Sequence, residues 1–342
     1  MSLLSRRDFL KLSGAGALGL LCAGLFPERI RAGEEPISQG RVTDGNIRVY
    51  DAPSTSANLV TSYWKDYVFP ISEAVISDNH EDYNRVWYRL ESGGFTYSGS
   101  IQPVMTILNT PVTTIPSQGV LAEVTVPYTD ARRRPGRDEP VRYRLYYQTT
   151  HWVVRIESDN SGTPWYLIQD DKWQDVRYYA QASHMHIYTP EELAPLSPDV
   201  PNYLKRIEIR LDDQLVIAYE GRHPVFMTRT ATGARFRNGT YSTPLGHFQT
   251  FHKRPFRHMA AGDLASNGYD LPGVPWVCYI TESGVALHGT YWHNDFGRPR
   301  SHGCINLPSR AAKWLYRWSQ PVVPPEEQFA LKSFGTGVDI FE

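Results

Sequence analysis

The sequence of 342 residues contains only three cysteines, at positions 22, 278 and 304, which excludes a small disulfide-stapled scaffold. It also lacks an excess of either charge, because 35 lysines and arginines face 36 aspartates and glutamates. No electrostatic field is therefore expected that would hold nucleic acid or an anionic surface. The single arginine run, at 132–137, is flanked by acidic residues and is typical of a solvated loop. After residue 32, no segment approaches the roughly 20 apolar residues that a membrane-spanning helix needs.

The N-terminus has the features of an export signal. Arg6 and Arg7 precede an apolar run from Leu12 to Phe26, which is too short to span a bilayer. Paired arginines before such a run predict a twin-arginine signal peptide at 1–32 and a periplasmic or extracellular protein. Lipid attachment at Cys22 is not expected, because the bulky Leu21 precedes it. An uncleaved signal would be the only membrane contact.

Frequent tyrosine, tryptophan, glycine and proline, with little helical periodicity, predict a mainly β protein of short strands and many turns. The first block, at 41–104, reads "RVTDGNIRVYDAPSTSANLV" and then "RVWYRLESGGFTYSGSIQPV". It resembles bacterial SH3-like domains, which are small barrels. In a second block, at 121–190, Trp165 and Tyr166 echo Trp87 and Tyr88 of the first, so we expect a second, divergent SH3-like barrel.

A proline-rich stretch at 191–203 predicts a stiff linker to a third domain at 204–342. That domain opens with alternating apolar and polar residues typical of a β-meander. "WVCYITESGVALH" predicts a hairpin that ends at His288, and "PSRAAKWLYRW" predicts a helix with Pro308 near its first turn.

Cys304 lies in "SHGCIN", close before this helix. We expect the positive end of the helix to favour a thiolate, and His288 to fold back onto the sulfur as its base. A thiol activated by a neighbouring imidazole is a nucleophile for acyl transfer. The amides of Gly303 and Cys304 are expected to form an oxyanion hole.

At these residues the chain resembles a known family. "HGTYWHNDFGRPRSHGCINL" is similar to the active-site signature of the YkuD-type L,D-transpeptidases, and "STPLGHF" at 242–248 to their second motif. The resemblance implies an L,D-transpeptidase-type β-sandwich, with Cys304 as nucleophile and His288 as base. The carbonyl of Gly289 would orient the imidazole, while His302 and Gly303 would complete the catalytic site. Tyr269 is a candidate oxyanion donor.

Other residues are expected to bind substrate or to support the site: Ser301, Gly289, Asn306, Tyr291, Trp292, His293, Arg300, Thr243 and Gly246.

The resemblance also implies the reaction. Cys304 would attack the amide between a diaminopimelate L-centre and the terminal D-alanine of a peptidoglycan stem peptide, and a second stem's amine would complete a 3→3 cross-link. Water as acceptor would make the protein an L,D-carboxypeptidase. The SH3-like domains would bind cell-wall polymer, so a non-catalytic wall-binding protein is a further alternative. Neither reaction needs a metal or organic cofactor.

Two other readings of Cys304 are open. An exported pair such as Cys278 and Cys304 could form a disulfide. Alternatively, His288, His293, His302 and Cys304 could bind zinc, although a ligand pair only two residues apart on a loop is unusual. The two family motifs favour a free nucleophilic thiol.

Overall fold

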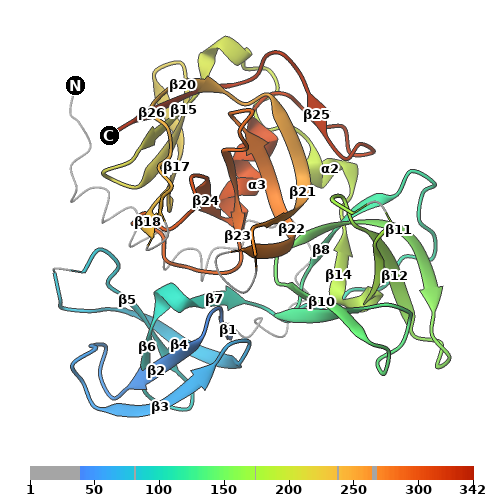
Figure 1. The fold of residues 1–342 in the computed structure, drawn as a ribbon, viewed down its shortest axis with the longest axis horizontal. Helices are drawn as coiled ribbons and strands as arrows, with labels where there is room; N and C mark the ends of the chain where they lie inside the picture. The colour runs from blue at the N-terminus through green and yellow to red at the C-terminus, as the bar shows by residue number, and fades with distance from the viewer. Residues whose placement is uncertain (1–38, 81, 174, 237–238, 264–267) are drawn as a thin grey trace.

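The computed structural model describes residues 39–80, 82–173, 175–236, 239–263 and 268–342. Figure 1 shows three parts: a first sheet in blue and cyan, a second sheet in green, and a C-terminal region in yellow to red. The prediction of a mainly β fold is confirmed. The signal predicted at 1–32 lies outside the described residues. Of the helices that are described, none is long and apolar enough to cross a membrane.

The first sheet has seven antiparallel strands in the order β3-β2-β6-β5-β4-β1-β7. Its strands are β1 (Gln39–Val42), β2 (Asn46–Tyr50), β3 (Leu59–Trp64), β4 (Val68–Ile76), β5 (Val86–Leu90), β6 (Phe95–Tyr97) and β7 (Ile101–Val104). Alternation along β2 buries Ile47 and Val49 in a small core and leaves Arg48 exposed. No ladder between described residues joins the outer strands β3 and β7, so the SH3-like barrel stays a prediction.

The second sheet repeats the same path, in the order β10-β9-β13-β12-β11-β8-β14. Its strands are β8 (Val120–Val124), β9 (Tyr128–Arg132), β10 (Val141–Tyr146), β11 (Thr150–Ser158), β12 (Pro164–Gln169), β13 (Arg177–Gln181) and β14 (Met185–Ile187). Each strand takes the place of the strand seven earlier in the chain. The pair Trp165 and Tyr166 on β12 is thus equivalent to Trp87 and Tyr88 on β5, and all four side chains are buried. The shared strand order supports a duplicated unit.

The C-terminal region contains two five-stranded sheets, β17-β16-β15-β26-β20 and β24-β23-β22-β21-β25, and a two-stranded ribbon of β18 and β19. The strands of the first sheet and the ribbon are β15 (Lys205–Arg210), β16 (Leu215–Glu220), β17 (His223–Arg229), β18 (Arg235–Phe236), β19 (Gly239–Thr240), β20 (Gly246–Gln249) and β26 (Gly337–Phe341). The strands of the second sheet are β21 (His252–Ala261), β22 (Tyr269–Tyr279), β23 (Ala286–Thr290), β24 (Ile305–Pro308) and β25 (Ala330–Leu331). The expected meander is β15 to β17, and the expected hairpin is β22 and β23.

Helix α3 (Ser309–Trp318) has Pro308 at its N-cap and shares one apolar core with both sheets of the C-terminal region. Trp318 is buried, and Trp314 stacks on Phe226 with ring centroids 4.3 Å apart. The 191–203 segment lies against this helix, since Arg317 Nε donates to the carbonyl of Ala194 at 2.8 Å. The segment between the second sheet and the C-terminal region is therefore packed rather than free.

Candidate active site

Two parallel strands place Cys304 and His288 on one face of a sheet. In the β23–β24 ladder His288 lies opposite Asn306 and Leu287 opposite Ile305, which sets Cys304 against Ala286. Side chains two apart on a strand share a face, so His288 is the next residue along β23 on the face that carries Cys304. The hairpin loop between β22 and β23 and the loop before β24 thus bring thiol and imidazole together across one strand gap.

The ring of His288 is buried and fixed by the backbone. Its Nδ1 lies 3.0 Å from the carbonyl oxygen of Gly289. Because a carbonyl only accepts, Nδ1 carries the proton and Nε2 has a free lone pair. Burial lowers the pKa of His288 to about 4, against the opposing effect of the Gly289 carbonyl. The imidazole is therefore neutral near pH 7 and able to accept a proton.

Gly289 has a structural reason to lack a side chain. A Cβ at this position would lie 2.7 Å from Pro275 Cγ and 3.0 Å from Ser309 Cα. The first distance is shorter than real Cβ atoms show and the second is tighter than most, so glycine at this position lets β23 pack closely against Pro275 and the first residue of α3. This approach fixes the carbonyl that bonds to His288.

Cys304 is a partly buried free thiol. Its Sγ lies 3.7 Å from the carbonyl oxygen of Gly284, and no hydrogen bond joins it to His288, also a described residue. Burial raises the pKa of the Cys304 thiol, although the Ala286 amide opposes this shift. The resting pair is thus a neutral thiol and a neutral imidazole. Proton transfer needs the sulfur to turn from Gly284 toward His288, a tightening common when substrate binds.

The expected help from the helix is wrong. The four residues of β24 lie between Cys304 and α3, and an extended strand of this length spans about 13 Å. The field of a helix end falls off within its first turn. The apolar residues after Cys304 form a buried strand, so the positive end of α3 does not stabilise a thiolate at this sulfur.

Of the two amides expected to form the oxyanion hole, that of Gly303 already donates a hydrogen bond within the loop. The amide of Gly303 donates to Ser301 Oγ at 3.1 Å, and Ser301 Oγ in turn donates to the carbonyl of Cys304. Ser301 thereby holds the tight turn around Gly303, whose φ of 106° favours glycine. Burial, and then electrostatic repulsion from Cys304 once its thiol ionises, raise the pKa of Tyr269, so the Tyr269 hydroxyl stays protonated and can donate.

Thr243 links the second motif to the nucleophile loop. Its Oγ1 accepts the amide of Gly233 at 2.9 Å and donates to the carbonyl of Gly303 at 2.9 Å. Gly246 of the same motif is not brought to the site, since it begins β20 in the other sheet, opposite Ile340. The threonine therefore supports the loop directly, whereas the glycine shapes a remote strand.

His302 lies at the surface among aromatic side chains. Its ring stacks on Phe236 with centroids 4.6 Å apart and lies 4.4 Å from the ring of Tyr241. The ring of Tyr269 lies 6.2 Å from that of His302. Trp292 lies beside the base, with its ring 5.8 Å from that of His288.

Three further residues expected to bind substrate or to support the site are buried. Tyr291 is 2% exposed and donates to the carbonyl of Pro272, so it is part of the core. His293 is equally buried; its Nδ1 accepts the amide of Asp295, and its Nε2 lies 3.0 Å from the Asn306 side chain. Burial lowers the pKa of His293 to about 3. Asn306 and His293 therefore both support the loop.

Sequence analysis did not single out Asp295, which organises the loop between His288 and Cys304. This carboxylate is fully buried, and Arg300 Nη1 binds it at 2.7 Å. Arg298 Nη2 lies 2.6 Å from the same oxygen. The sequence pattern that could have indicated this cluster is an aspartate followed by arginines three and five residues later. Arg300 therefore contacts the loop rather than the reacting sulfur.

The competing readings of Cys304 can be compared with this geometry. Cys278 and Cys304 are both free thiols, and Cys278 is buried in β22, so no disulfide joins them. Within the described ranges, no group of three or more His, Cys, Asp or Glu side chains is arranged to hold a metal ion.

A family comparison agrees with this arrangement. Residues 204–328 match the YkuD family, the L,D-transpeptidase catalytic domain. The matched range contains β15 to β24 and α3, and with them Cys304, His288 and Thr243. It supports L,D-transpeptidase activity in general for this catalytic domain. The match covers less than half of the chain, and no protein of curated function matches the sequence.

Solved structures similar to this chain include three L,D-transpeptidases. A mutant of the Enterococcus faecium enzyme is 24% identical over 40% of this chain, with a TM-score of 0.31, and the alignment spans 49% of that protein's length. The enzyme from Mycobacterium smegmatis is 18% identical, over 57% of this chain and 90% of its own, with a TM-score of 0.33. One from Mycobacterium tuberculosis H37Rv is 14% identical, over 72% and 91%, with a TM-score of 0.29.

Proposed function

We propose that this protein is a peptidoglycan L,D-transpeptidase that works through a Cys304 thioester. The observation that carries the proposal is the placement of Cys304 and His288 on one face of adjacent strands, with His288 Nδ1 bound to the Gly289 carbonyl. This leaves a neutral Nε2 lone pair directed away from the backbone, beside a thiol. The match of residues 204–328 to the catalytic domain supports the same chemistry.

The first half-reaction forms the thioester. His288 Nε2 takes the proton of Cys304, and the sulfur attacks the carbonyl that joins the diaminopimelate L-centre to D-alanine. The C–N bond then breaks, and the imidazolium returns the proton to the leaving amine of D-alanine. General-base help of this kind is worth about 10²–10⁴-fold in rate. The amide of Cys304 and the hydroxyl of Tyr269 are the donors that would stabilise the oxyanion.

The second half-reaction releases the acyl group. The side-chain amine of another stem attacks the thioester, His288 removes a proton from that amine, and the thiolate leaves to regain it. The product is a 3→3 cross-link. No metal or organic cofactor enters either step, because imidazole and thiol supply the base and the nucleophile.

The remaining expectations complete the proposal. A twin-arginine signal at 1–32 would export the protein, so that it works in the periplasm or outside the cell, in contact with the wall. The two N-terminal sheets would be SH3-like units that hold wall polymer close to the catalytic domain. Their identical strand order supports a common origin for the two units.

Product analysis tests the reaction. Purified tetrapeptide stems are incubated with the protein, and free D-alanine and peptide masses are measured. We expect a dimer lacking one D-alanine, no product with Cys304→Ala, and unchanged product with the matched control Cys278→Ser. Tripeptide without dimer would identify a carboxypeptidase instead. A Cys304→Ala variant that still formed dimer would exclude the thioester mechanism.

A further inference from the structure

The loop that follows His288 is held at its start by the first sheet. Arg41 on β1 donates from Nη2 to the carbonyl oxygen of Tyr291 at 2.7 Å. Tyr291 is three residues after His288 in the chain. The guanidinium is 1% exposed, so water does not compete for this contact.

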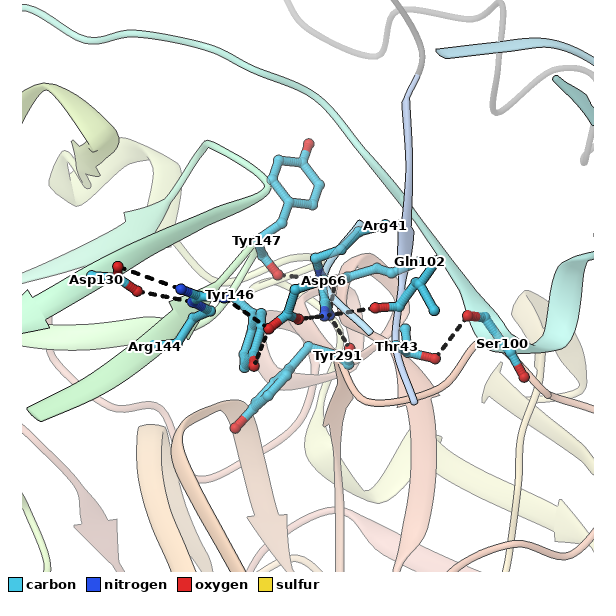
Figure 2. A network of polar contacts seen from close by, with 11 residues as sticks. Arg41, Thr43, Asp66, Ser100, Gln102, Asp130, Arg144, Tyr146, Tyr147 and Tyr291 are labelled. Atoms are coloured by element: carbon cyan, nitrogen blue, oxygen red, sulfur yellow. Dashed lines mark hydrogen bonds and ion pairs between the residues drawn. The ribbon is translucent and has the colours of Figure 1, made fainter. Parts of the chain in front are cut away.

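The Arg41 guanidinium pairs with a carboxylate and with a side-chain amide oxygen. Its Nη1 lies 3.1 Å from Asp66 Oδ1, and its Nη2 donates to Gln102 Oε1 at 2.7 Å. The other oxygen of Asp66 accepts from Arg144 of the second sheet at 3.0 Å. Figure 2 shows this chain of contacts, with Arg144 to the left of Asp66 and Tyr291 below Arg41. A buried charge that is this fully paired fixes the relative position of its partners.

The same loop is held again four residues later. The Asp295 carboxylate accepts hydrogen bonds from Tyr97 Oη on β6 at 2.9 Å and from Tyr83 Oη in the connection between β4 and β5. The amide of Asn294 donates to the carbonyl of Gly99 at 2.9 Å. Gly99 fits only without a side chain, since a Cβ there would lie 2.7 Å from Asp295 Oδ1.

Asp295 is connected to the strands that carry the reacting groups. Its amide donates to His293 Nδ1 at 3.1 Å, and His293 Nε2 lies 3.0 Å from the side chain of Asn306. Asn306 is two residues after Cys304 and pairs with His288 in the β23–β24 ladder. Each link in this path is buried, so a displacement of Asp295 moves groups that touch the strand after Cys304.

We propose that the first sheet acts as a built-in positioning element for the reaction, with Tyr83 and Tyr97 holding Asp295 and Arg41 holding Tyr291. The two tyrosine hydroxyls and the guanidinium fix the loop between His288 and Cys304 and thereby the alignment of imidazole and thiol. These are positioning residues, because none of them touches the sulfur. The inference rests on the proposed acyl transfer at Cys304, but not on peptidoglycan as the substrate.

The test uses the full chain and an activated ester that needs no peptide recognition. With p-nitrophenyl acetate, a Cys304 S–C bond forms, the ester C–O bond breaks, and the thiol proton passes through His288 as p-nitrophenol leaves. The variant Tyr83→Phe/Tyr97→Phe removes two hydroxyls and keeps both rings. Its matched control is Tyr63→Phe/Tyr67→Phe, since among the described contacts neither of these hydroxyls bonds to the loop.

We expect the double variant to acylate Cys304 at least about 10-fold more slowly near neutral pH, because general-base help depends on alignment. Its rate should recover as the pH rises and the thiol ionises without help, a change that lower stability alone would not produce. The control should match the wild type at every pH. Equal rates and pH profiles in all three proteins would overturn the proposal.

Two further outcomes separate this inference from the proposed function. A slowed Tyr83→Phe/Tyr97→Phe variant in a protein that releases no D-alanine from stems would keep the positioning role and reject the substrate. Normal D-alanine release with an unaffected double variant would do the reverse. If the double variant does not fold, the single Tyr83→Phe variant carries the test, because that side chain is 38% exposed.

Discussion

The proton on Cys304 decides when this residue can react. Burial raises the pKa of the Cys304 thiol, and burial lowers the pKa of His288 to about 4. Both shifts favour neutral partners, since forming a thiolate beside an imidazolium would place two charges in a buried site. Reactivity therefore depends on a proton transfer that accompanies attack, rather than on a thiolate present in advance.

This charge state predicts a specific pH profile for alkylation. In a Cys278→Ser background, we expect iodoacetamide to label Cys304 slowly at about pH 6 and progressively faster above about pH 9, as the thiol itself ionises. A preformed thiolate–imidazolium pair would instead give nearly full reactivity from about pH 5 upward. Mass mapping of the labelled peptide against pH distinguishes the two. A flat profile through the acidic range would contradict the neutral pair.

At the scale of single elements, helix α3 depends on two buried lysines. Lys253 Nζ donates to the carbonyls of Tyr316 at 2.5 Å and Ser319 at 2.7 Å, and Lys205 Nζ donates to that of Trp318 at 3.0 Å. The last carbonyls of a helix have no partner within it, and a cation there also interacts favourably with the negative end of the helix dipole. The two lysines, on β21 and β15, thus fasten the end of α3 to both sheets.

Removing one of these cations should weaken the catalytic domain. Lys253→Met keeps most of the apolar stem but leaves two buried carbonyls without a donor, so the free energy of unfolding should fall by about 1–3 kcal/mol. Denaturant unfolding measures the change. Lys332→Met, at an exposed position, is the control and should stay within about 0.5 kcal/mol of the wild type. Equal stability of both variants would contradict the capping role.

The elements that sequence patterns predict here are the local ones. Period-two alternation indicated β15 and β16, and Pro308 with the following apolar spacing indicated α3. The four residues of β24 are too few to show the alternation of a strand. Sequence analysis therefore did not predict β24 and expected Cys304 close to the start of the helix. Parallel pairing of β23 with β24 leaves no turn signal between them, because such strands are joined by a long connection.

The same limit applied to the site. His288, Cys304 and Thr243 stand in recognisable motifs, and the structure brings all three to one loop system. Arg41 contacts Tyr291 across 250 positions, and nothing in either local sequence marks the pair. Long-range polar contacts of this kind depend on how the sheets pack, which a local pattern does not contain.

At the scale of the whole molecule, the second sheet is part of the catalytic domain's core. Leu121, Trp152 and Tyr188 belong to the same cluster of buried side chains as Phe256 and Trp276. Trp152 stacks on Phe256 with centroids 6.0 Å apart, and Tyr188 meets Trp276 at 5.6 Å.

Ion pairs and hydrogen bonds also join the second sheet to strand β21 of the C-terminal region. Asp171, in the connection between β12 and β13, accepts from Arg254 at 2.7 Å and from Arg257 at 2.8 Å, both on β21. His258 on the same strand lies 2.6 Å from Asp170. Hydrogen bonds to Asp170 and Asp270 outweigh burial and raise the pKa of His258, so the stability that this contact adds is lost as the pH rises through the folded-state pKa.

This shared core predicts that the two N-terminal sheets differ in how far the fold depends on them. A chain beginning at residue 204 exposes the surfaces that Leu121, Trp152 and Tyr188 cover. Burial of such side chains is worth about 1.5–3 kcal/mol each, so their loss, about 5–9 kcal/mol in all, approaches the total stability of a typical domain. We expect this fragment to be unfolded or insoluble.

A chain beginning at residue 105, which lacks only the first sheet, should remain folded but should acylate Cys304 slowly, because it loses Arg41, Tyr83 and Tyr97. Thermal unfolding followed by circular dichroism, with acylation by p-nitrophenyl acetate, measures both effects. If the 204–342 fragment unfolded within a few degrees of the full chain, the second sheet would be a separate module and not part of the catalytic core.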